Sequence, residues 1–235
     1  LQRLFKSSDE FSSPTDFVGS VHNAVAAQLA IRCGAEGPNV TATAGDVSFE
    51  QALLCATLLA DHRPFILAGV DEAHPTLSAL FDPSVAAAAV LADGGAAFLS
   101  RRAVHGESGP FVTLLHLARA ESRVNSLVGA LGGARRIQDR YAAIFVGVPL
   151  AHRQGGDSHL QKFIQTTRFA GPVFHYRQAI GEIATSSAIA TALAVALVQR
   201  GFLPEAMVRN GNAELNAKGV LLLNLGPNSA ALEVI

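Results

Sequence analysis

The chain has 235 residues, of which 49% are hydrophobic and 16% are charged, and its net charge is −1. This length and hydrophobicity predict one large domain with a sizeable buried core. The charges are interspersed and form no basic run, which argues against a nucleic-acid-binding surface. The longest apolar stretch, residues 183–198, contains several hydroxyl side chains and is too short to cross a bilayer, so we expect no membrane span.

The two cysteines, Cys33 and Cys55, are too few for a disulfide framework or a zinc site. The glycine-rich segments fit neither a dinucleotide-binding nor a P-loop pattern, so we expect no cofactor and no metal. Reduced thiols and the lack of a signal peptide before Leu1 favour a cytoplasmic protein. The chain starts without Met, which indicates that a preceding segment is missing.

The first half predicts two helices and four strands from its apolar periodicity. The helices are expected over 21–31, ending at Cys33-Gly34, and over 48–60; the strands are expected over 39–43, 64–70, 94–99 and 111–118. The second helix would bury one face, made of Phe49, Leu53, Leu54 and Leu58. The continuous apolar run 64–70 is typical of a strand covered on both faces in a largely parallel sheet. Residues 94–99 and 111–118 predict an antiparallel pair.

The second half predicts helices and strands in a similar order. The helices are expected over 122–135, 157–167 and 181–200, and the strands over 143–148, 173–176, 219–224 and 230–235. Gly201 would end the third helix. Gly226-Pro227-Asn228 predicts a hairpin between the last two strands.

Several segments resemble the beta-ketoacyl synthase-like subunits called chain-length factors, most closely those of aryl-polyene clusters. The closest segments are Ser12–Phe17, Ser20–Ala24 and Gly37–Val40. Three later segments resemble the Gly-Asp-Gly-Ala, Gly-His and C-terminal Gly-rich segments of ketosynthases, namely Ala92–Ala97, Ile180–Glu182 and Leu225–Ala230. The resemblance implies an α/β fold of the thiolase-like (ketosynthase) type, layered α-β-α-β-α with two similar halves and lacking some N-terminal elements. It also implies one ketosynthase-like domain over 1–235, with halves of about 1–118 and 119–235.

Asp46 occupies the position that the resemblance assigns to the ketosynthase nucleophile. In that family a cysteine at a strand-to-helix junction attacks an acyl thioester, and the helix N-terminus lowers its pKa. The cysteine follows Gly-Pro-x-Val by a short strand and a Thr-Ala pair, and here residues 37–45 lead to Asp46. A carboxylate forms no labile thioester, so we expect no catalytic nucleophile. We predict instead that Asp46 caps the helix that follows.

The two histidines of the family's catalytic set are degenerate in this sequence. His152 stands where the first is expected, and Glu182 occupies the position of the second. With one imidazole, the usual two-histidine decarboxylation of a malonyl group is not available. We predict that Glu182 is a carboxylate at a helix N-terminus and that His152 is a loop or interface residue. Cys33, at a helix C-terminus, and Cys55, on an apolar helix face, offer no substitute thiol.

The resemblance further implies a non-catalytic subunit that pairs with an active ketosynthase as a heterodimer and shapes its acyl tunnel, with the acyl carrier protein as a further partner. In the related fold, the segment 15–35 runs close to the subunit interface. Residues expected at the interface or tunnel end are His22, Asn23, Asn39, Thr41, Phe49 and Leu53.

Two alternatives stay open at this point. One is a repurposed thiolase-fold enzyme that acts on acyl or malonyl thioesters with Asp46, Glu182 and His152 as acid–base groups. The other is an active homodimeric synthase that uses an unrecognised thiol, for which Cys33 is the residue to test.

Overall fold

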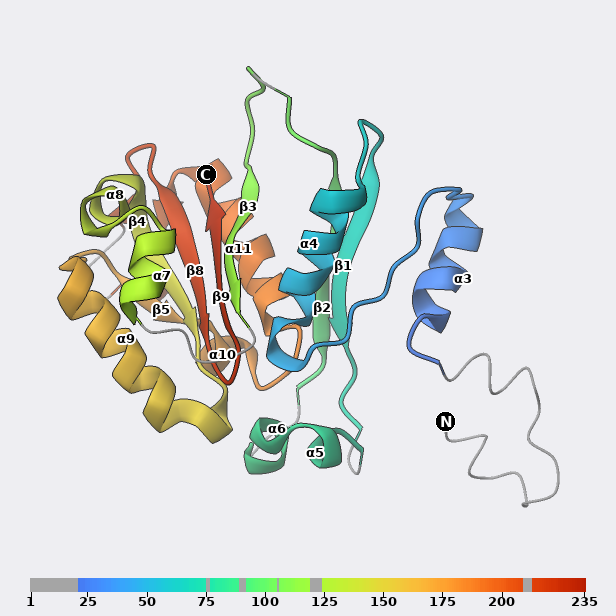
Figure 1. The fold of residues 1–235 in the computed structure, drawn as a ribbon, viewed down its shortest axis with the longest axis horizontal. Coiled ribbons are helices and arrows are strands. Elements are labelled where there is room, and N and C mark those ends of the chain that lie inside the picture. The colour runs from blue at the N-terminus through green and yellow to red at the C-terminus, as the bar shows by residue number, and fades with distance from the viewer. Residues whose placement is uncertain (1–20, 75–76, 89–91, 105, 119–123, 209–212) are drawn as a thin grey trace. The chain divides into compact units, whose positions relative to one another are not determined.

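Figure 1 shows the computed structural model of the chain, which describes residues 21–74, 77–88, 92–104, 106–118, 124–208 and 213–235. The chain divides into two compact units, residues 1–43 and 44–235. None of the helices in the described ranges combines the length and hydropathy that a bilayer span requires.

The first unit contains helix α3 (Ala24–Cys33), which confirms the predicted helix and its end. Gly34 adopts the left-handed conformation, φ 61°, and its N–H donates to the carbonyl of Ile31. This conformation suits glycine because a side chain would be strained there. The strand predicted over 39–43 is wrong: these residues form no regular structure, and Val40 is 49% exposed. A strand requires a paired neighbour, and no strand in the described ranges pairs with this segment.

The second unit is built around a five-stranded sheet of order β3-β9-β8-β4-β5. Its strands are β3 (Val112–Ala118), β4 (Tyr141–Gly147), β5 (Val173–His175), β8 (Gly219–Leu225) and β9 (Ser229–Val234). Strand β4 is parallel to β5 and β8, whereas β8–β9 and β9–β3 are antiparallel. The predicted strands of the second half and their final hairpin are therefore confirmed.

Helices cover both faces of this sheet (Figure 1). One face carries α7 (Val124–Ala130), α8 (Ala134–Arg140) and α9 (Arg153–Thr167). The other carries α11 (Ser186–Arg200), with α4 (Ser48–Leu59) and α10 (Tyr176–Ile180) nearby. Alternate residues of β4 enter the two cores: Ile144 and Val146 lie in the cluster with α7–α9, and Phe145 lies in the cluster with α11.

A second sheet of two antiparallel strands, β1 (Phe65–Asp71) and β2 (Gly94–Ser100), packs on the far side of α11. Gly69 allows this close approach, since a Cβ at that position would lie 2.6 Å from the Cβ of Ala188. Within the described part of residues 44–235, no helix or sheet packs on the opposite face of the strands. This face consists of three apolar cross-strand pairs: Ile66–Leu99, Ala68–Ala97 and Val70–Gly95.

Short elements complete the unit. They are η1 (Gly45–Val47), α5 (Leu77–Phe81), α6 (Pro83–Ala87), η2 (Leu150–His152), β6 (Phe202–Leu203), η3 (Glu205–Met207) and β7 (Ala213–Glu214).

Two predictions about strands in the first half are wrong. Residues 94–99 and 111–118 do not pair with each other, because β2 pairs with β1 and β3 pairs with β9. Within the described part of residues 44–235, only one face of 64–70 is covered, and Val70 is 68% exposed. In both cases the local pattern indicates a strand, but long-range packing decides its neighbours.

The predicted helices need three corrections. The helix expected over 122–135 is split into α7 and α8, because Gly132 and Gly133 both have positive φ, and residues 122–123 lie outside the described ranges. Helix α11 begins at Ser186 rather than at Gly181. On α4, Phe49 and Leu53 are buried, but Leu54 and Leu58 are exposed, so the buried face is narrower than predicted.

Gly147, at the end of β4, is a position where even one added methyl group should be costly. A Cβ there would overlap the phenol ring of Tyr176, which is 1% exposed and has no room to retreat. Substitution Gly147→Ala should therefore lower the free energy of unfolding by about 3 kcal/mol or more. In the control Gly129→Ala, on α7, the added Cβ meets open space, and stability should rise by about 0.5–1 kcal/mol. Urea unfolding measures the free energy of unfolding of both variants. Equal changes in the two would contradict the close packing of Gly147 against Tyr176.

Candidate functional site

Asp46 lies in η1, one turn before α4, and is 8% exposed. Its Oδ1 accepts a hydrogen bond of 2.8 Å from Asn228 Nδ2, and its backbone carbonyl accepts one from Asn224 Nδ2. A Cβ at Gly226 would collide with Asp46 Oδ2, so the carboxylate is packed directly against the β8–β9 turn. The hairpin therefore holds Asp46 at the end of the central strands.

The predicted helix cap by Asp46 is wrong. Neither η1 nor α4 receives a side-chain cap hydrogen bond at its N-cap residue. Ser48 stabilises this corner instead, because its Oγ accepts from the N–H of Ala44 at 2.9 Å and donates to the carbonyl of Gly45 at 2.7 Å. The Asp46 side chain accepts its hydrogen bond from Asn228 instead of from the helix.

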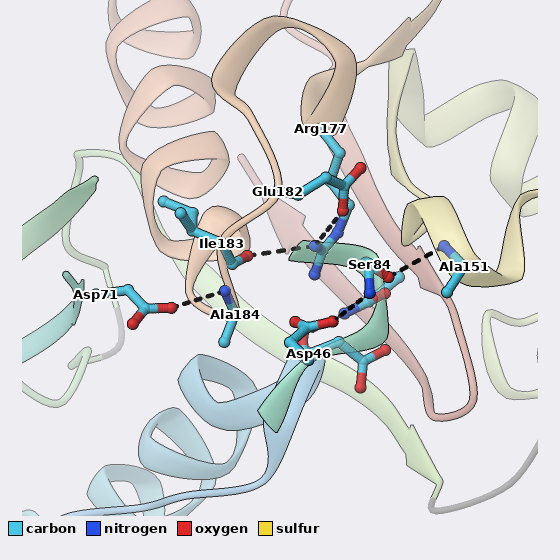
Figure 2. Close-up of polar contacts among 10 residues, drawn as sticks. Asp46, Asp71, Ser84, Ala151, Arg177, Glu182, Ile183 and Ala184 are labelled. Carbon is cyan, nitrogen blue, oxygen red and sulfur yellow. Dashed lines mark hydrogen bonds and ion pairs between the residues drawn. The ribbon is translucent and has the colours of Figure 1, made fainter. Parts of the chain in front are cut away.

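Arg177 and Glu182 form a buried ion pair beside this corner, as Figure 2 shows. Arg177 Nη1 lies 3.2 Å from Glu182 Oε2 and also donates to the carbonyl of Ile183 at 3.2 Å. The two side chains are only 2% and 9% exposed. Glu182 precedes the start of α11 by four residues, so the prediction of a carboxylate at that helix N-terminus is wrong. Its partner is a cation, not the helix dipole.

Two further hydrogen bonds connect the elements around this corner (Figure 2). Asp71, at the end of β1, accepts a 2.9 Å hydrogen bond from the N–H of Ala184. Ser84 of α6, which is 1% exposed, accepts a 3.1 Å hydrogen bond from the N–H of Ala151. The first bond joins the end of β1 to the loop between α10 and α11, and the second joins α6 to η2.

Glu50, one turn after Asp46 on α4, is a third buried carboxyl group of the site. It is 1% exposed, and its Oε2 accepts a 3.1 Å hydrogen bond from Ser187 Oγ at the start of α11. Burial raises the pKa of Glu50 to about 7, with a smaller contribution in the same direction from the charge of Asp46. Burial also raises the pKa of Asp46, although Asn228 and Arg177 oppose that shift. Both carboxyl groups thus favour their protonated forms more than exposed acids do.

Several buried polar atoms around this corner have no protein hydrogen-bond partner within the described part of the chain. They are Asp46 Oδ2, Asn224 Oδ1, Arg177 Nε, Arg177 Nη2, Thr185 Oγ1 and Ser186 Oγ. We call the group formed by Asp46, Glu50, Arg177, Glu182, Asn224 and Asn228 the polar centre. It contains acids, a cation and amides, but no thiol and no imidazole among its members. Its chemistry is therefore that of proton exchange and charge pairing rather than of acyl transfer through a thioester.

The other residues singled out from the sequence lie outside the polar centre. His152 ends η2 and is exposed. Cys33 is exposed at the end of α3, and Cys55 is half-buried on α4. Across the described ranges, no group of three or more potential ligand side chains could hold a metal ion.

The six residues expected at an interface or tunnel fall in both units. Phe49 and Leu53 lie in the core between the sheets, where the ring of Phe49 is 5.6 Å from that of Phe98. In the first unit, His22, Asn23 and Thr41 are exposed, and Asn39 Nδ2 donates to the carbonyl of Ala26 at 3.0 Å. Their role in an interface stays a prediction.

Sequence reasoning missed four members of the polar centre: Glu50, Arg177, Asn224 and Asn228. Glu50 carries the clearest signal, since it stands on the same helical side as the apolar residues Phe49 and Leu53 and is the one charged residue of the helix. Asn224 interrupts a fully apolar strand, which also indicates a buried polar role. Arg177 follows a short strand without a distinguishing pattern, and no local signal identifies it.

Residues 1–116 match the family model described as the N-terminal domain of beta-ketoacyl synthase. No curated protein matches the sequence at a significant level. Among solved structures, a beta-ketoacyl synthase from Burkholderia phymatum STM815 is 13% identical with a TM-score of 0.68, over 99% of this chain and 70% of that one.

Two further solved structures come from polyketide-type systems. The AntDE:AntF complex, a type II polyketide synthase acyl-carrier protein with its ketosynthase bound to a hexaketide, matches at 13% identity and a TM-score of 0.64, over 99% of this chain and 70% of that one. The ishigamide ketosynthase/chain length factor matches at 19% identity and a TM-score of 0.62, over 100% of this chain and 67% of that one. These likenesses show that the chain has the thiolase-like ketosynthase fold, as the sequence predicted.

Proposed function

We propose that this ketosynthase-fold chain is a non-catalytic, chain-length-factor-like subunit. It pairs with an active beta-ketoacyl-[acyl carrier protein] synthase in the cytoplasm and shapes that partner's acyl tunnel in polyketide, aryl-polyene or fatty-acid-like biosynthesis. The observation that carries the proposal is the buried carboxylate of Asp46 at the start of α4. Neither cysteine of the chain stands there: Cys33 ends α3, and Cys55 lies more than two turns further along α4. Without a thiol at this corner, the thioester intermediate must form on the partner.

The face of β1 and β2 that no described element of residues 44–235 covers supports a role that depends on another polypeptide. Leu99 and Val70 are 81% and 68% exposed, and the pairs across this face are all apolar. Continuous apolar surface of this kind is typical of a region that another polypeptide covers. The exposed edge of β1, which pairs only with β2 among the described strands, adds unpaired backbone groups to the same region.

Co-expression with a ketosynthase encoded beside this chain tests the proposal. We expect a 1:1 complex on size exclusion, in which an acyl-thioester substrate labels the partner and leaves this chain unlabelled. The variant Asp46→Cys serves as a control, because it restores a thiol while Glu182 still replaces the histidine, so condensation should remain with the partner. A stable monomer or homodimer that does not bind the ketosynthase, or acylation of the wild-type chain itself, would contradict the proposal.

A second candidate function is a repurposed enzyme that acts on malonyl or acyl thioesters with Asp46, Glu182 and His152 as acid–base groups. The raised pKa values of Asp46 and Glu50 favour it, because shifted carboxyl groups are common at sites of proton transfer. If it holds, the isolated chain should decarboxylate or hydrolyse malonyl carrier protein, and Asp46→Ala should abolish the turnover. Mass spectrometry of the carrier protein gives the readout. Turnover that is absent in the wild type, or unchanged in Asp46→Ala, would exclude this candidate.

A further inference from the structure

A pocket of about 640 Å³ lies at the end of the central sheet opposite the polar centre. It is found beside the start of β4 and β8, whereas Asp46 contacts the turn that follows β8. Its lining residues are Gly132, Arg135, Arg136, Asp139, Arg140, Ala217, Lys218 and Ile235. The pocket is shallow and largely open to solvent.

Positive charge dominates the pocket, although the whole chain is almost neutral. Arg140 is held by the buried carboxylate of Glu233, through contacts of 2.7 and 3.0 Å. Glu233 also accepts a 2.8 Å hydrogen bond from Tyr141. Burial alone would favour the protonated acid, but the hydrogen bonds from Arg140 and Tyr141 hold the pKa of Glu233 below its usual value. Arg140 is therefore anchored in a fixed position.

The positive charges of the other three basic side chains are neutralised less by nearby carboxylates. Arg135 lies 3.7 Å from Asp139, but their side chains are 95% and 73% exposed, so this pair is weak. Lys218 Nζ donates to a neutral carbonyl, that of Gln138, at 2.9 Å. The stem of Arg136 lies against Gly132, where a Cβ would be 2.6 Å from Arg136 Cδ. The four basic side chains of the pocket thus outnumber the carboxylates of Asp139 and Glu233 that balance them.

A strained turn holds Lys218 at the rim of the pocket. Asn216 and Ala217 both have positive φ, 49° and 59°, and the N–H of Lys218 closes the turn on the carbonyl of Leu215 at 2.8 Å. A left-handed alanine is unfavourable, because its Cβ approaches the backbone. Strain of this kind tends to be kept where a ligand is bound.

We propose that this pocket binds a small molecule through a phosphate or diphosphate group. Guanidinium groups match phosphate oxygens with paired N–H donors, and Arg135 and Arg136 both have donors to offer at this surface. The surplus of positive charge suits a ligand that carries two or more negative charges. The site is separate from the polar centre, so the proposal stands whether or not the proposed function is correct.

Titration of the full chain with inorganic diphosphate, followed by calorimetry at low ionic strength, tests the proposal. We expect saturable 1:1 binding that weakens at least about tenfold in the double variant Arg135→Ala/Arg136→Ala. The variant Arg136→Lys keeps the charge but loses the paired donors, and its affinity should be intermediate. Arg153→Ala, an exposed arginine at the start of α9, is the matched control and should bind as the wild type does.

A parallel titration with adenosine diphosphate distinguishes a nucleotide from a free diphosphate. Tighter binding of the nucleotide, lost in the same double variant, would identify the remaining pocket volume as a nucleoside site. Equal affinity would show that the diphosphate group alone is recognised. Absence of saturable binding for both compounds, or equal affinity of the wild type and the double variant, would overturn the proposal.

Discussion

Substitution Arg177→Met is expected to lower the free energy of unfolding by about 3–5 kcal/mol, which is the largest effect that we predict for a single residue. Arg177 is the only cation of the polar centre as defined above, and its side chain is 2% exposed. Its loss leaves the carboxylate of Glu182 buried without a counter-charge, and it removes the bond to the carbonyl of Ile183. Desolvation of an unpaired charge is costly because protein and solvent no longer stabilise it.

A double-mutant cycle separates this charge effect from simple loss of packing. Arg177→Met combined with Glu182→Gln removes both charges, and we expect it to recover a large part of the stability lost in the single variant. Arg63→Met is the surface control: Arg63 pairs with Asp61 at 2.8 Å, but the side chains are 73% and 52% exposed, so the change should stay within about 0.5 kcal/mol. Urea unfolding at pH 7 gives all values. A double variant as unstable as Arg177→Met would show that packing, not charge, dominates.

The second large effect concerns the pH dependence of stability, and Glu50 is its main source. The pKa of Glu50 is raised from 4.5 to about 7 in the folded chain. Between these values the folded state retains a proton that the unfolded state releases. The resulting stabilisation is complete below pH 4.5 and is lost as the pH rises through 7. The slope is at most about 1.4 kcal/mol for each pH unit.

Glu50→Gln should therefore be more stable than the wild type at pH 8 and should show a flatter pH profile. The glutamine oxygen can still accept the hydrogen bond from Ser187, so the substitution removes the ionisation and keeps the contact. The groups that act on Glu50 are Asp46 and Arg177, and Tyr176 is also close enough to interact. Asp46, whose pKa is raised as well, shifts stability in the same direction.

Urea unfolding at pH 5.5, 7.0 and 8.5 measures the difference between the two profiles. The control Glu205→Gln, at an exposed position on η3, should follow the wild-type profile. Parallel profiles for the wild type and Glu50→Gln would mean that Glu50 ionises in the folded chain as easily as an exposed acid does.

The elements that the sequence predicted best are those with a strong local signal, either a continuous apolar run or a tight turn between neighbouring strands. Strand β4 reads as a continuous apolar run and is buried on both faces, and β8 and β9 are joined by a three-residue turn. In the first half, the strand predicted over 39–43 does not form, and the strands predicted over 94–99 and 111–118 form but pair with other partners than predicted. Nothing in the local pattern of 94–99 indicates that it pairs with 65–71 rather than with 112–118.

The candidate site was predictable only in part for a similar reason. The alignment of Gly37–Val40 with a family motif identified Asp46, and the same reasoning identified Glu182 and His152. The partners of the two carboxyl groups near the start of α4 are distant in sequence: Asn228 follows Asp46 by 182 residues, and Ser187 follows Glu50 by 137. Without knowledge of the packing, Asp46 and Glu182 were both interpreted as helix-terminal carboxylates, which is the common local use of such residues.

The sequence by itself determined the ketosynthase-like fold class, the absence of a cysteine at the start of α4, and the buried strands of the second half. These properties depend on residue identity and on short-range periodicity. Only the tertiary structure decided that Asp46, Glu50, Arg177 and Glu182 form one polar centre, and that four cations gather at the opposite end of the sheet. The polar centre arises because packing brings together segments far apart along the chain, and packing also places Lys218 beside the three arginines of α8. The charge and burial of a side chain depend on such neighbours.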